Sequence, residues 1–220
     1  NRNYGSTLLG DADHRAPVRS GRERHARMIP VLILAAGQSR RMRGADKLMQ
    51  DVDGKPLLRR QIEIAAPIGT VYVALPDLTH ARATALNGTS AIPFGIAESN
   101  EGIGGTLRGA VSRMPKGPFM LLLGDLISLF TKDLRAIIDV LDKHPDHLVW
   151  RGATPDGKGG HPIIFHESLI PEFAKLSGDT GGETIVKPLK SRTYLHLFPD
   201  NRARHDLDTP EEWAAWRNLR

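Results

Sequence analysis

The chain of 220 residues contains no cysteine. This absence excludes a disulfide framework, a thiolate nucleophile and a cysteine zinc site, and it suits a reducing cytoplasm, the localisation that we expect. Aromatic residues make up only 5% of the chain. Few surfaces are therefore available for stacking on bases, and we expect no nucleic-acid partner. No apolar run reaches the roughly 18 residues that span a bilayer, so we expect no membrane partner.

Two common phosphate-binding motifs are also missing. The string G-x-x-x-x-G-K-[ST] does not occur, which excludes a P-loop. The segment Gly102-Ile103-Gly104-Gly105 begins like the dinucleotide fingerprint G-x-G-x-x-G, but Leu107 stands where the last glycine is needed. A nucleotide site in this chain would have to use another kind of loop.

Positive charge is concentrated at the start of the chain. Residues 1–27 contain six arginines and three acidic residues, so they supply +3 of the formal net charge of +5. The same residues lack strand or helix periodicity. We expect residues 1–27 to be a basic, poorly ordered extension and residues 28–220 to form a single domain.

Short apolar segments then alternate with segments of helical periodicity. Strands are predicted over residues 30–36, 70–75, 91–96 and 119–123. Helices are predicted over residues 56–65, 78–85, 106–114 and 131–141. This alternation favours an α/β fold, a Rossmann-like open and mostly parallel sheet with helices on both faces. The glycine-rich segment 152–160 is interpreted as a β excursion within one domain.

The segment after the first predicted strand is the most informative. Its apolar run stops at Gly37 and is followed by Arg40, Arg41, Arg43 and Lys47. Open α/β sheets bind ligands at the carboxyl ends of their strands, and backbone N–H groups backed by arginine and lysine suit a polyphosphate. We predict a loop that holds a nucleoside triphosphate; the alternative is a solvated turn with surface arginines.

Acidic residues follow at two later points. Asp125 comes directly after the apolar strand 119–123, where a carboxylate can hold the Mg²⁺ that accompanies a triphosphate. Its alternative role is a turn or helix cap. Asp206 and Asp208 share one face of an extended segment, which makes Asp208 a second candidate ligand. The sequence from Thr209 to Glu212 also reads as a capping box that starts a helix.

Together these motifs resemble the molybdenum cofactor cytidylyltransferases, which belong to the molybdopterin nucleotidyltransferases and have a Rossmann-like fold of the nucleotide-diphospho-sugar transferase type. The matching residues are Leu34, Ala35, Ala36, Gly37, Ser39, Arg41, Met42, Gly44, Lys47, Gly54, Pro56, Leu57 and Leu58. The chain departs from the family pattern at Arg43, an insertion, and after Asp125, where the proline of D-x-P is absent and Leu126 replaces a polar residue.

The resemblance implies roles for individual residues. Arg41, Lys47 and Asp125 would be catalytic, and Asp125 and Asp208 would hold Mg²⁺. The nucleotide would be bound by Leu34, Ala35, Ala36, Gly37, Ser39, Arg41, Lys47, Gly104 and Thr106. The acceptor would be bound by His161, Gly178 and Asp179, which lie in the family segments G-H-P and S-G-D-x-G. Alternatively, His161 makes a structural hydrogen bond, and Thr180 and Glu183 form a capping box.

The resemblance also implies a reaction. The pair Ala35-Ala36 goes with CTP in this family, so the reaction would transfer CMP to molybdopterin and release pyrophosphate. A molybdenum hydroxylase or its maturation factor would be the protein partner. Three alternatives remain: a nucleotidyltransferase for GTP or another phosphate acceptor, an NAD(P)-dependent oxidoreductase, and a non-catalytic nucleotide-binding or chaperone-like protein.

Overall fold

The computed structural model describes residues 27–220. The expected extension over residues 1–27 therefore lies outside the described residues, except for Arg27, whose guanidinium is 2.9 Å from the carboxylate of Asp142. No helix within residues 27–220 combines the length and the apolar character that crossing a membrane requires.

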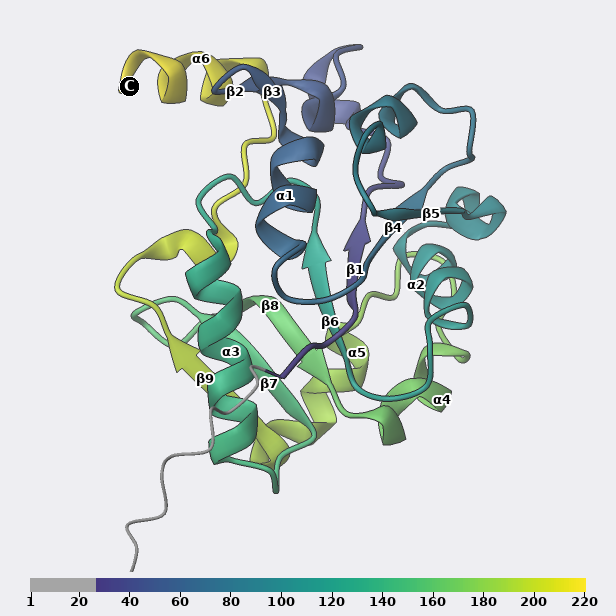
Figure 1. Ribbon diagram of the computed structural model, residues 1–220, viewed down its shortest axis with the longest axis vertical. Helices are drawn as coiled ribbons and strands as arrows, with labels where there is room; N and C mark the ends of the chain where they lie inside the picture. The colour runs from purple at the N-terminus through teal and green to yellow at the C-terminus, as the bar shows by residue number, and fades with distance from the viewer. Residues whose placement is uncertain (1–26) are drawn as a thin grey trace, which may run out of the picture.

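A seven-stranded sheet forms the centre of the molecule (Figure 1). In spatial order its strands are β5 (Ile92–Gly95), β4 (Val71–Leu75), β1 (Val31–Leu34), β6 (Phe119–Leu123), β8 (Gly159–Phe165), β7 (Val149–Ala153) and β9 (Thr193–Leu197). Every neighbouring pair is parallel except those that contain β8. The predicted mostly parallel sheet is confirmed, and segment 152–160 connects the antiparallel hairpin of β7 and β8, as its glycine content indicated.

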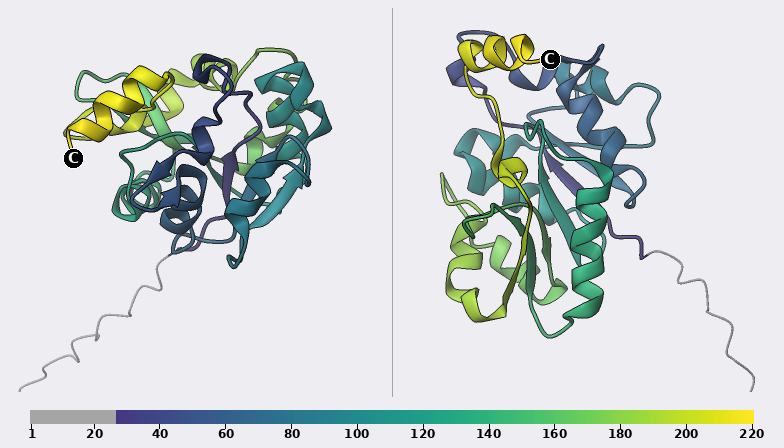
Figure 2. Two further views of the ribbon diagram at one scale, coloured as in Figure 1. Left: turned by 90° about the horizontal axis from the view of Figure 1, so that it is seen from above. Right: turned by 90° about the vertical axis from the view of Figure 1, so that its left-hand side faces the viewer.

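Helices cover both faces of this sheet (Figure 2). The α-helices are α1 (Leu57–Ala65), α2 (Ile103–Val111), α3 (Thr131–Lys143), α4 (Ile170–Phe173), α5 (Glu183–Val186) and α6 (Pro210–Asn218). The 3-10 helices are η1 (Arg40–Met42), η2 (Lys47–Met49), η3 (Ala81–Leu86), η4 (Ala97–Glu101), η5 (Glu167–Leu169), η6 (Lys187–Arg192) and η7 (Asn201–Arg204). Apolar side chains of α1 and α3 pack on one face of the sheet, and those of α2, α4 and α5 pack on the other.

The central strands β1 and β6 are apolar on both faces because helices cover both sides. They pair in parallel, with Leu34 opposite Leu123. The two loops that follow them therefore leave the sheet at the same edge. Gly124 brings these loops close together, since its N–H donates to the carbonyl of Leu34 over 3.0 Å.

A small third apolar cluster lies beyond this edge. It joins Met42 of η1 and Leu57 of α1 to Leu207 and to Trp213 of α6. The short hairpin of β2 (Asp51–Val52) and β3 (Lys55–Pro56) completes this part of the molecule, which lies at the top of Figure 1. The cluster packs the C-terminal segment against the loop that follows β1.

Two predicted helices differ from the observed ones. Residues 78–85 were expected to form an α-helix, but 3-10 helix η3 begins only at Ala81. Helix α2 begins at Ile103 and not at Thr106, so it includes Gly104 and Gly105. These glycines are weak helix formers. The packing of the helix nevertheless requires glycine here, because added Cβ atoms would collide with the backbones of Ser177 and Glu98.

Candidate active site

The loop between β1 and η2 folds tightly back on itself. Ser39 has φ 48°, Arg43 has φ 53° and Gly44 has φ 95°, and all three values lie in the left-handed region. Between them, the short helix η1 turns the buried side chain of Met42 into the third apolar cluster. The exposed side of the same turn carries Arg41.

Three polar side chains hold the base of this loop in place. The hydroxyl of Ser39 accepts from the backbone N–H of Lys47 over 3.3 Å and from Arg82 over 3.1 Å. Asp46 accepts from Arg82 at 2.6 and 2.9 Å and from the backbone N–H of Leu48 at 3.0 Å. Arg82 also donates to the carbonyl of Ala35 over 2.6 Å. Because the Arg82 side chain is only 3% exposed, its ion pair with Asp46 is a structural anchor of the loop.

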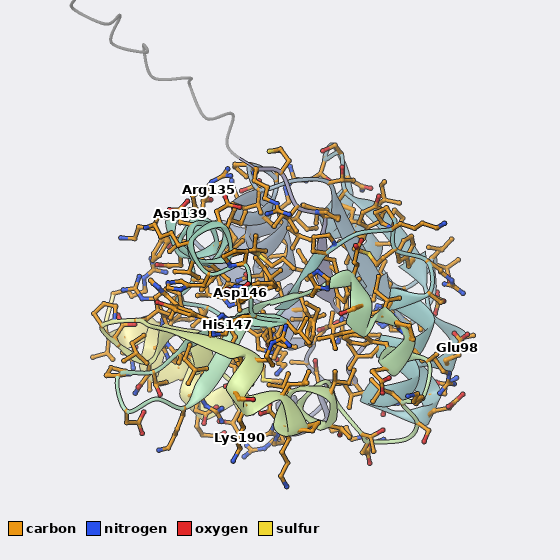
Figure 3. All side chains as sticks on the ribbon, turned by 90° about the horizontal axis from the view of Figure 1, so that it is seen from below. Glu98, Arg135, Asp139, Asp146, His147 and Lys190 are labelled. Atoms are coloured by element: carbon orange, nitrogen blue, oxygen red, sulfur yellow. The ribbon has the colours of Figure 1, made fainter. Side chains whose placement is uncertain are left out.

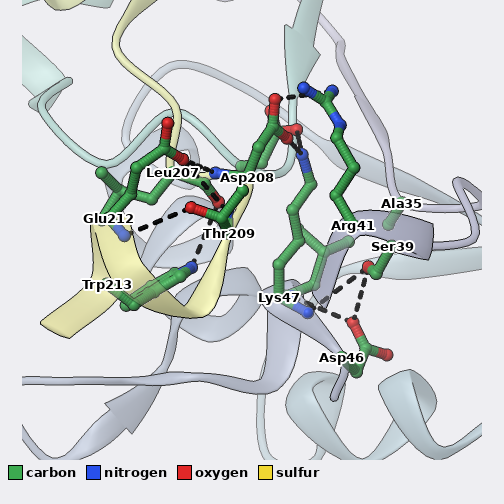
Figure 4. A network of polar contacts seen from close by, with 12 residues as sticks. Ala35, Ser39, Arg41, Asp46, Lys47, Leu207, Asp208, Thr209, Glu212 and Trp213 are labelled. Atoms are coloured by element: carbon green, nitrogen blue, oxygen red, sulfur yellow. Dashed lines mark hydrogen bonds and ion pairs between the residues drawn. The ribbon is translucent and has the colours of Figure 1, made fainter. Parts of the chain in front are cut away.

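Charged side chains meet at the centre of the site (Figure 4). Lys47 forms ion pairs with Asp125 and with Asp208, the latter over 2.8 Å, and Arg41 lies 2.6 Å from Asp208. Burial lowers the pKa of Lys47, but the two carboxylates outweigh it and the pKa ends above its usual value. Lys47 is therefore a permanent cation held between two acids.

Asp125, Asp206 and Asp208 form a cluster that can hold a metal ion, with one oxygen of each within 4.8 Å of the others. An isolated antiparallel bridge between Leu126 and Asp206 brings the two segments side by side. Desolvation and the charges of Asp125 and Asp208 raise the pKa of Asp206, although the residue as a whole is exposed. A bound cation would relieve this repulsion.

The oxygen Oδ1 of Asp125 supports the same interpretation. It is buried, and no donor among the described residues bonds to it. A buried carboxylate oxygen without a partner is costly unless a cation or water meets it. Three carboxylates beside a basic loop are the donor set that a hard divalent ion prefers. The residues present therefore fit a divalent metal.

A cleft of about 590 Å³ opens beside these charges. Of the residues predicted for the site, those that line it are Leu34, Ala36, Gly37, Ser39, Arg41, Lys47, Thr106, Asp125, Asp179 and Asp208. The opposite wall comes from η4 and the start of α2, through residues 99–103. Loops far apart in the sequence thus share one cleft at the carboxyl edge of the sheet.

Four predicted residues lie outside the lining of this cleft. Ala35 is buried, and its carbonyl accepts a hydrogen bond from Arg82. Gly104 and Gly178 join the start of α2 to the loop before α5, since the N–H of Gly104 donates to the carbonyl of Gly178 over 2.8 Å. His161 lies on β8, and its Nδ1 is 3.3 Å from the carbonyl of Leu121. The structure thus gives each of these residues a backbone or packing contact and no place in the lining of the cleft.

The two departures from the family pattern have simple structural outcomes. Arg43 fits in the left-handed turn after η1, and its guanidinium lies 2.7 Å from Glu211 of α6. Leu126 is 2% exposed and packs in the main core, away from the cleft. Leu126 therefore contributes no side chain to the cleft. The inserted arginine adds a surface contact between the loop and α6.

The two predicted capping boxes have opposite outcomes. The one from Thr209 to Glu212 is confirmed: Thr209 accepts from the N–H of Glu212, and Glu212 accepts from the N–H groups of Asp208 and Thr209. The one from Thr180 to Glu183 is wrong. Thr180 instead bonds to the backbone of Ser177, and helix α5 starts after Gly182.

Sequence reasoning missed several residues that the structure places at or near the site. Arg82 lay within a segment that showed only helical periodicity, and nothing local indicates that it reaches Asp46, 36 positions away. Asp206 was recognised as sharing a face with Asp208, but only Asp208 was chosen as a candidate ligand, whereas the structure places both in the cluster. Arg151 carried no motif, and Glu183 was predicted only as part of a capping box, yet the two form an ion pair whose charges act on His161.

Comparison with known proteins agrees with the fold. The sheet order and the cleft at its carboxyl edge define a Rossmann-like protein of the nucleotidyltransferase type. Residues 31–193 match the MobA-like NTP transferase domain, which is most of the chain, and the chain belongs to that family.

Two of the proteins that this chain resembles are a curated sequence and a solved structure. The bifunctional protein GlmU of Chromohalobacter salexigens is 27% identical over 143 residues, which are 64% of this chain, and the chain spans about a third (31%) of that protein's length. Rv0371c of Mycobacterium tuberculosis has a crystal structure with 26% identity and a TM-score of 0.70, covering 87% of this chain and 99% of that one. It was also solved as a complex with manganese, with 25% identity and a TM-score of 0.64 over 86% of this chain and 97% of that one.

Molybdopterin-guanine dinucleotide biosynthesis protein A of Archaeoglobus fulgidus shares the fold. Its TM-score is 0.63 at 14% identity, with 87% of this chain and 98% of that chain covered. At this identity the likeness concerns the fold alone.

Proposed function

We propose that this protein is a metal-dependent nucleotidyltransferase that transfers CMP from CTP to the phosphate of molybdopterin and releases pyrophosphate. The observation that carries the proposal is the convergence of Arg41 and Lys47 with Asp125, Asp206 and Asp208 at one cleft. Cations for a polyphosphate and carboxylates for its metal are the two components that phosphoryl transfer needs.

The nucleotide would lie along the loop after β1. Leu34, Ala36 and Gly37 line the cleft at this point, and Ser39 fixes the turn through its hydrogen bonds to Lys47 and Arg82. Arg41 and Lys47 would neutralise the β- and γ-phosphates. Thr106 and the residues of η4 would form the opposite wall. The choice of CTP rests on the resemblance of Ala35 and Ala36 to the cytidylyltransferase signature.

The metal would be held by Asp125 and Asp208, with Asp206 completing the carboxylate set. When bound, Mg²⁺ would supply positive charge at the α-phosphate. The ion pairs of Lys47 with Asp125 and Asp208 hold the cation in place before substrate arrives. Lys47 can then exchange a carboxylate partner for a phosphate without leaving the site.

The reaction itself is a single displacement. An oxygen of the acceptor phosphate forms a bond to the α-phosphorus of CTP, and the bond between the α-phosphorus and the bridging oxygen to the β-phosphate breaks. Pyrophosphate leaves with that oxygen and its electron pair, and Arg41 and Lys47 stabilise its charge. The attacking phosphate is already anionic, so no general base is required, and positioning and charge neutralisation carry the catalysis.

Pyrophosphate release tests this proposal. The protein would be incubated with molybdopterin and, in turn, CTP, GTP, ATP or UTP, with and without Mg²⁺. We expect release with CTP that depends on both molybdopterin and Mg²⁺. Release with another triphosphate, or with a different phosphorylated acceptor, would keep the enzyme class and overturn the substrate. Nucleotide binding without any release would indicate a non-catalytic protein.

A further inference from the structure

A buried cation lies on the sheet beside the cleft and has no part in the proposed nucleotide site. Arg151 of β7 has a side chain that is only 6% exposed. Its Nε donates to the carbonyl of Gly160 over 3.2 Å, and its Nη1 lies 2.9 Å from the carboxylate of Glu183. A guanidinium in such a place must keep an anionic partner, because an unpaired buried charge is strongly unfavourable.

The sequence makes room for this guanidinium. A Cβ atom on Gly159, the first residue of β8, would lie 2.7 Å from Cζ of Arg151. Glycine at this position therefore lets the side chain of Arg151 lie flat against the neighbouring strand. Besides Glu183, the guanidinium is held by the carbonyl of Gly160.

The partner of this cation is far less fixed. The Glu183 side chain is 68% exposed and stands at the first residue of the four-residue helix α5. A carboxylate that already faces water loses little when it leaves a buried partner, provided that another anion takes its place. Another anion can therefore replace Glu183 as the partner of Arg151.

Neither member of the pair lines the cleft itself, but a loop and a histidine connect the pair with it. Residues 174–182 join α4 to Glu183, and Asp179 in this loop lines the cleft. His161, one strand away from Arg151, feels the charges of Arg151, Asp125 and Glu183. These three charged groups thus surround one histidine, between the proposed metal site and α5.

His161 supplies no positive charge of its own. Burial above all, together with the charge of Arg151, lowers its pKa to about 4, so the ring is neutral at neutral pH. A carbonyl only accepts hydrogen bonds, so the Nδ1 atom facing Leu121 carries the proton and Nε2 is an acceptor. The cation beside this histidine is Arg151.

We propose that Arg151 binds an anionic group of the acceptor, a phosphate or a carboxylate, which replaces Glu183 on the guanidinium. The inference rests on the proposed transfer to a phosphorylated acceptor and adds a residue to its acceptor side. Arginine suits this exchange because its planar fork binds carboxylate and phosphate with the same geometry. Glu183 keeps the cation neutralised until the acceptor arrives.

The two members of the pair should respond in opposite directions. With CTP and molybdopterin as substrates, Glu183→Gln removes the competing carboxylate, and we expect the KM for molybdopterin to fall about fivefold. Arg151→Gln should raise that KM at least about tenfold. The KM for CTP should stay unchanged in both variants. Glu167→Gln, a change at an exposed carboxylate on η5, is the matched control.

A purely structural ion pair would give a different result. In that case both variants would lose stability. In Glu183→Gln the KM for molybdopterin would then rise or stay the same, and a KM that does not fall would overturn the proposal. If Arg151→Gln fails to fold, Gly159→Ala replaces it, since the added Cβ displaces the guanidinium and should also raise the KM for molybdopterin.

A binding measurement separates this inference from the proposed reaction. Titration calorimetry with inorganic phosphate, in the presence of saturating nucleotide, reads the acceptor side without any turnover. We expect tighter phosphate binding in Glu183→Gln than in the native protein, and weaker binding in Arg151→Gln. Equal binding in all three would overturn the inference even if pyrophosphate release were found. If phosphate binds in the expected order of affinity but no pyrophosphate is released with any substrate, the inference is upheld and the proposed transfer is rejected.

Discussion

The two halves of the proposed site neutralise their charges in different ways. In the proposed nucleotide half (residues 34–47, 125 and 206–208), Lys47, Asp125 and Asp208 form a network in which the three side chains are 16–17% exposed. In the proposed acceptor half (residues 151, 161 and 177–183), one buried cation meets one exposed carboxylate. The first arrangement suits a nucleotide polyphosphate that arrives with its metal ion. The second suits the replacement of one carboxylate, that of Glu183, by one anionic group of the acceptor.

Loss of Asp125 should have the largest effect on the nucleotide half. Asp125→Asn removes the carboxylate with the unpartnered buried oxygen, and we expect Mg²⁺-dependent turnover to fall by at least about 10³-fold. The fold should remain intact, as circular dichroism would show. The control is Asp139→Asn, an exposed change on α3 visible from below in Figure 3. Full activity in Asp125→Asn would reject the site.

Replacing Lys47 should separate catalysis from metal binding. Lys47→Met removes the cation between Asp125 and Asp208, and we expect turnover to fall about 10²-fold. In the absence of nucleotide, Mn²⁺ should bind more tightly, because the carboxylates lose a competing cation. Turnover and Mn²⁺ titration calorimetry measure the two effects, with the exposed Lys116→Met as the control. Weaker Mn²⁺ binding in Lys47→Met would contradict the paired-charge account.

Arg82 should affect the nucleotide half through the shape of its loop. Arg82→Met breaks the ion pair with Asp46 and the bond to Ala35, and we expect a loss of about 3 kcal/mol in unfolding free energy. Among molecules that remain folded, the KM for CTP should rise and the KM for molybdopterin should not. Urea unfolding and kinetics, compared with Arg113→Met, would check this. Equal changes in both KM values would show that Arg82 acts on the whole cleft.

His161 should give the smallest effect, a change of stability with pH. Burial lowers its pKa to about 4 in the folded protein, against an ordinary value of about 6.5 in the unfolded chain. Between these values the unfolded chain binds more protons, so this contribution is full above pH 6.5 and is lost as the pH falls towards 4. Urea unfolding at several pH values should show this slope in the native protein and a shallower one in His161→Asn. Identical slopes would exclude His161 as the cause.

Much of the nucleotide half was predictable because its signals are local. The apolar strand, the glycine and the basic residues all lie within 17 positions, from Val31 to Lys47. The position of Asp125 followed from the strand before it, since parallel strands end at the same edge of a sheet.

The rest depends on contacts between distant residues. The anchor from Arg82 to Asp46 spans 36 positions, and the bond from Lys47 to Asp208 spans 161. Arg151 stands in a segment whose strand was not predicted, and its partner Glu183 lies 32 positions away. Strand β9 and the early start of α2 at Ile103 were missed for the same reason, because tertiary packing overrides weak local preference.

Calorimetric binding of CTP, with and without Mg²⁺, tests the central claim most directly. GTP, ATP, UTP and NADPH would be titrated in the same way, and Asp125→Asn would serve as the variant without the metal ligand. We predict that CTP binds most tightly, that Mg²⁺ strengthens its binding, and that Asp125→Asn loses the effect of Mg²⁺. Binding of NADPH alone, or CTP binding that is indifferent to Mg²⁺ and to Asp125, would contradict the account.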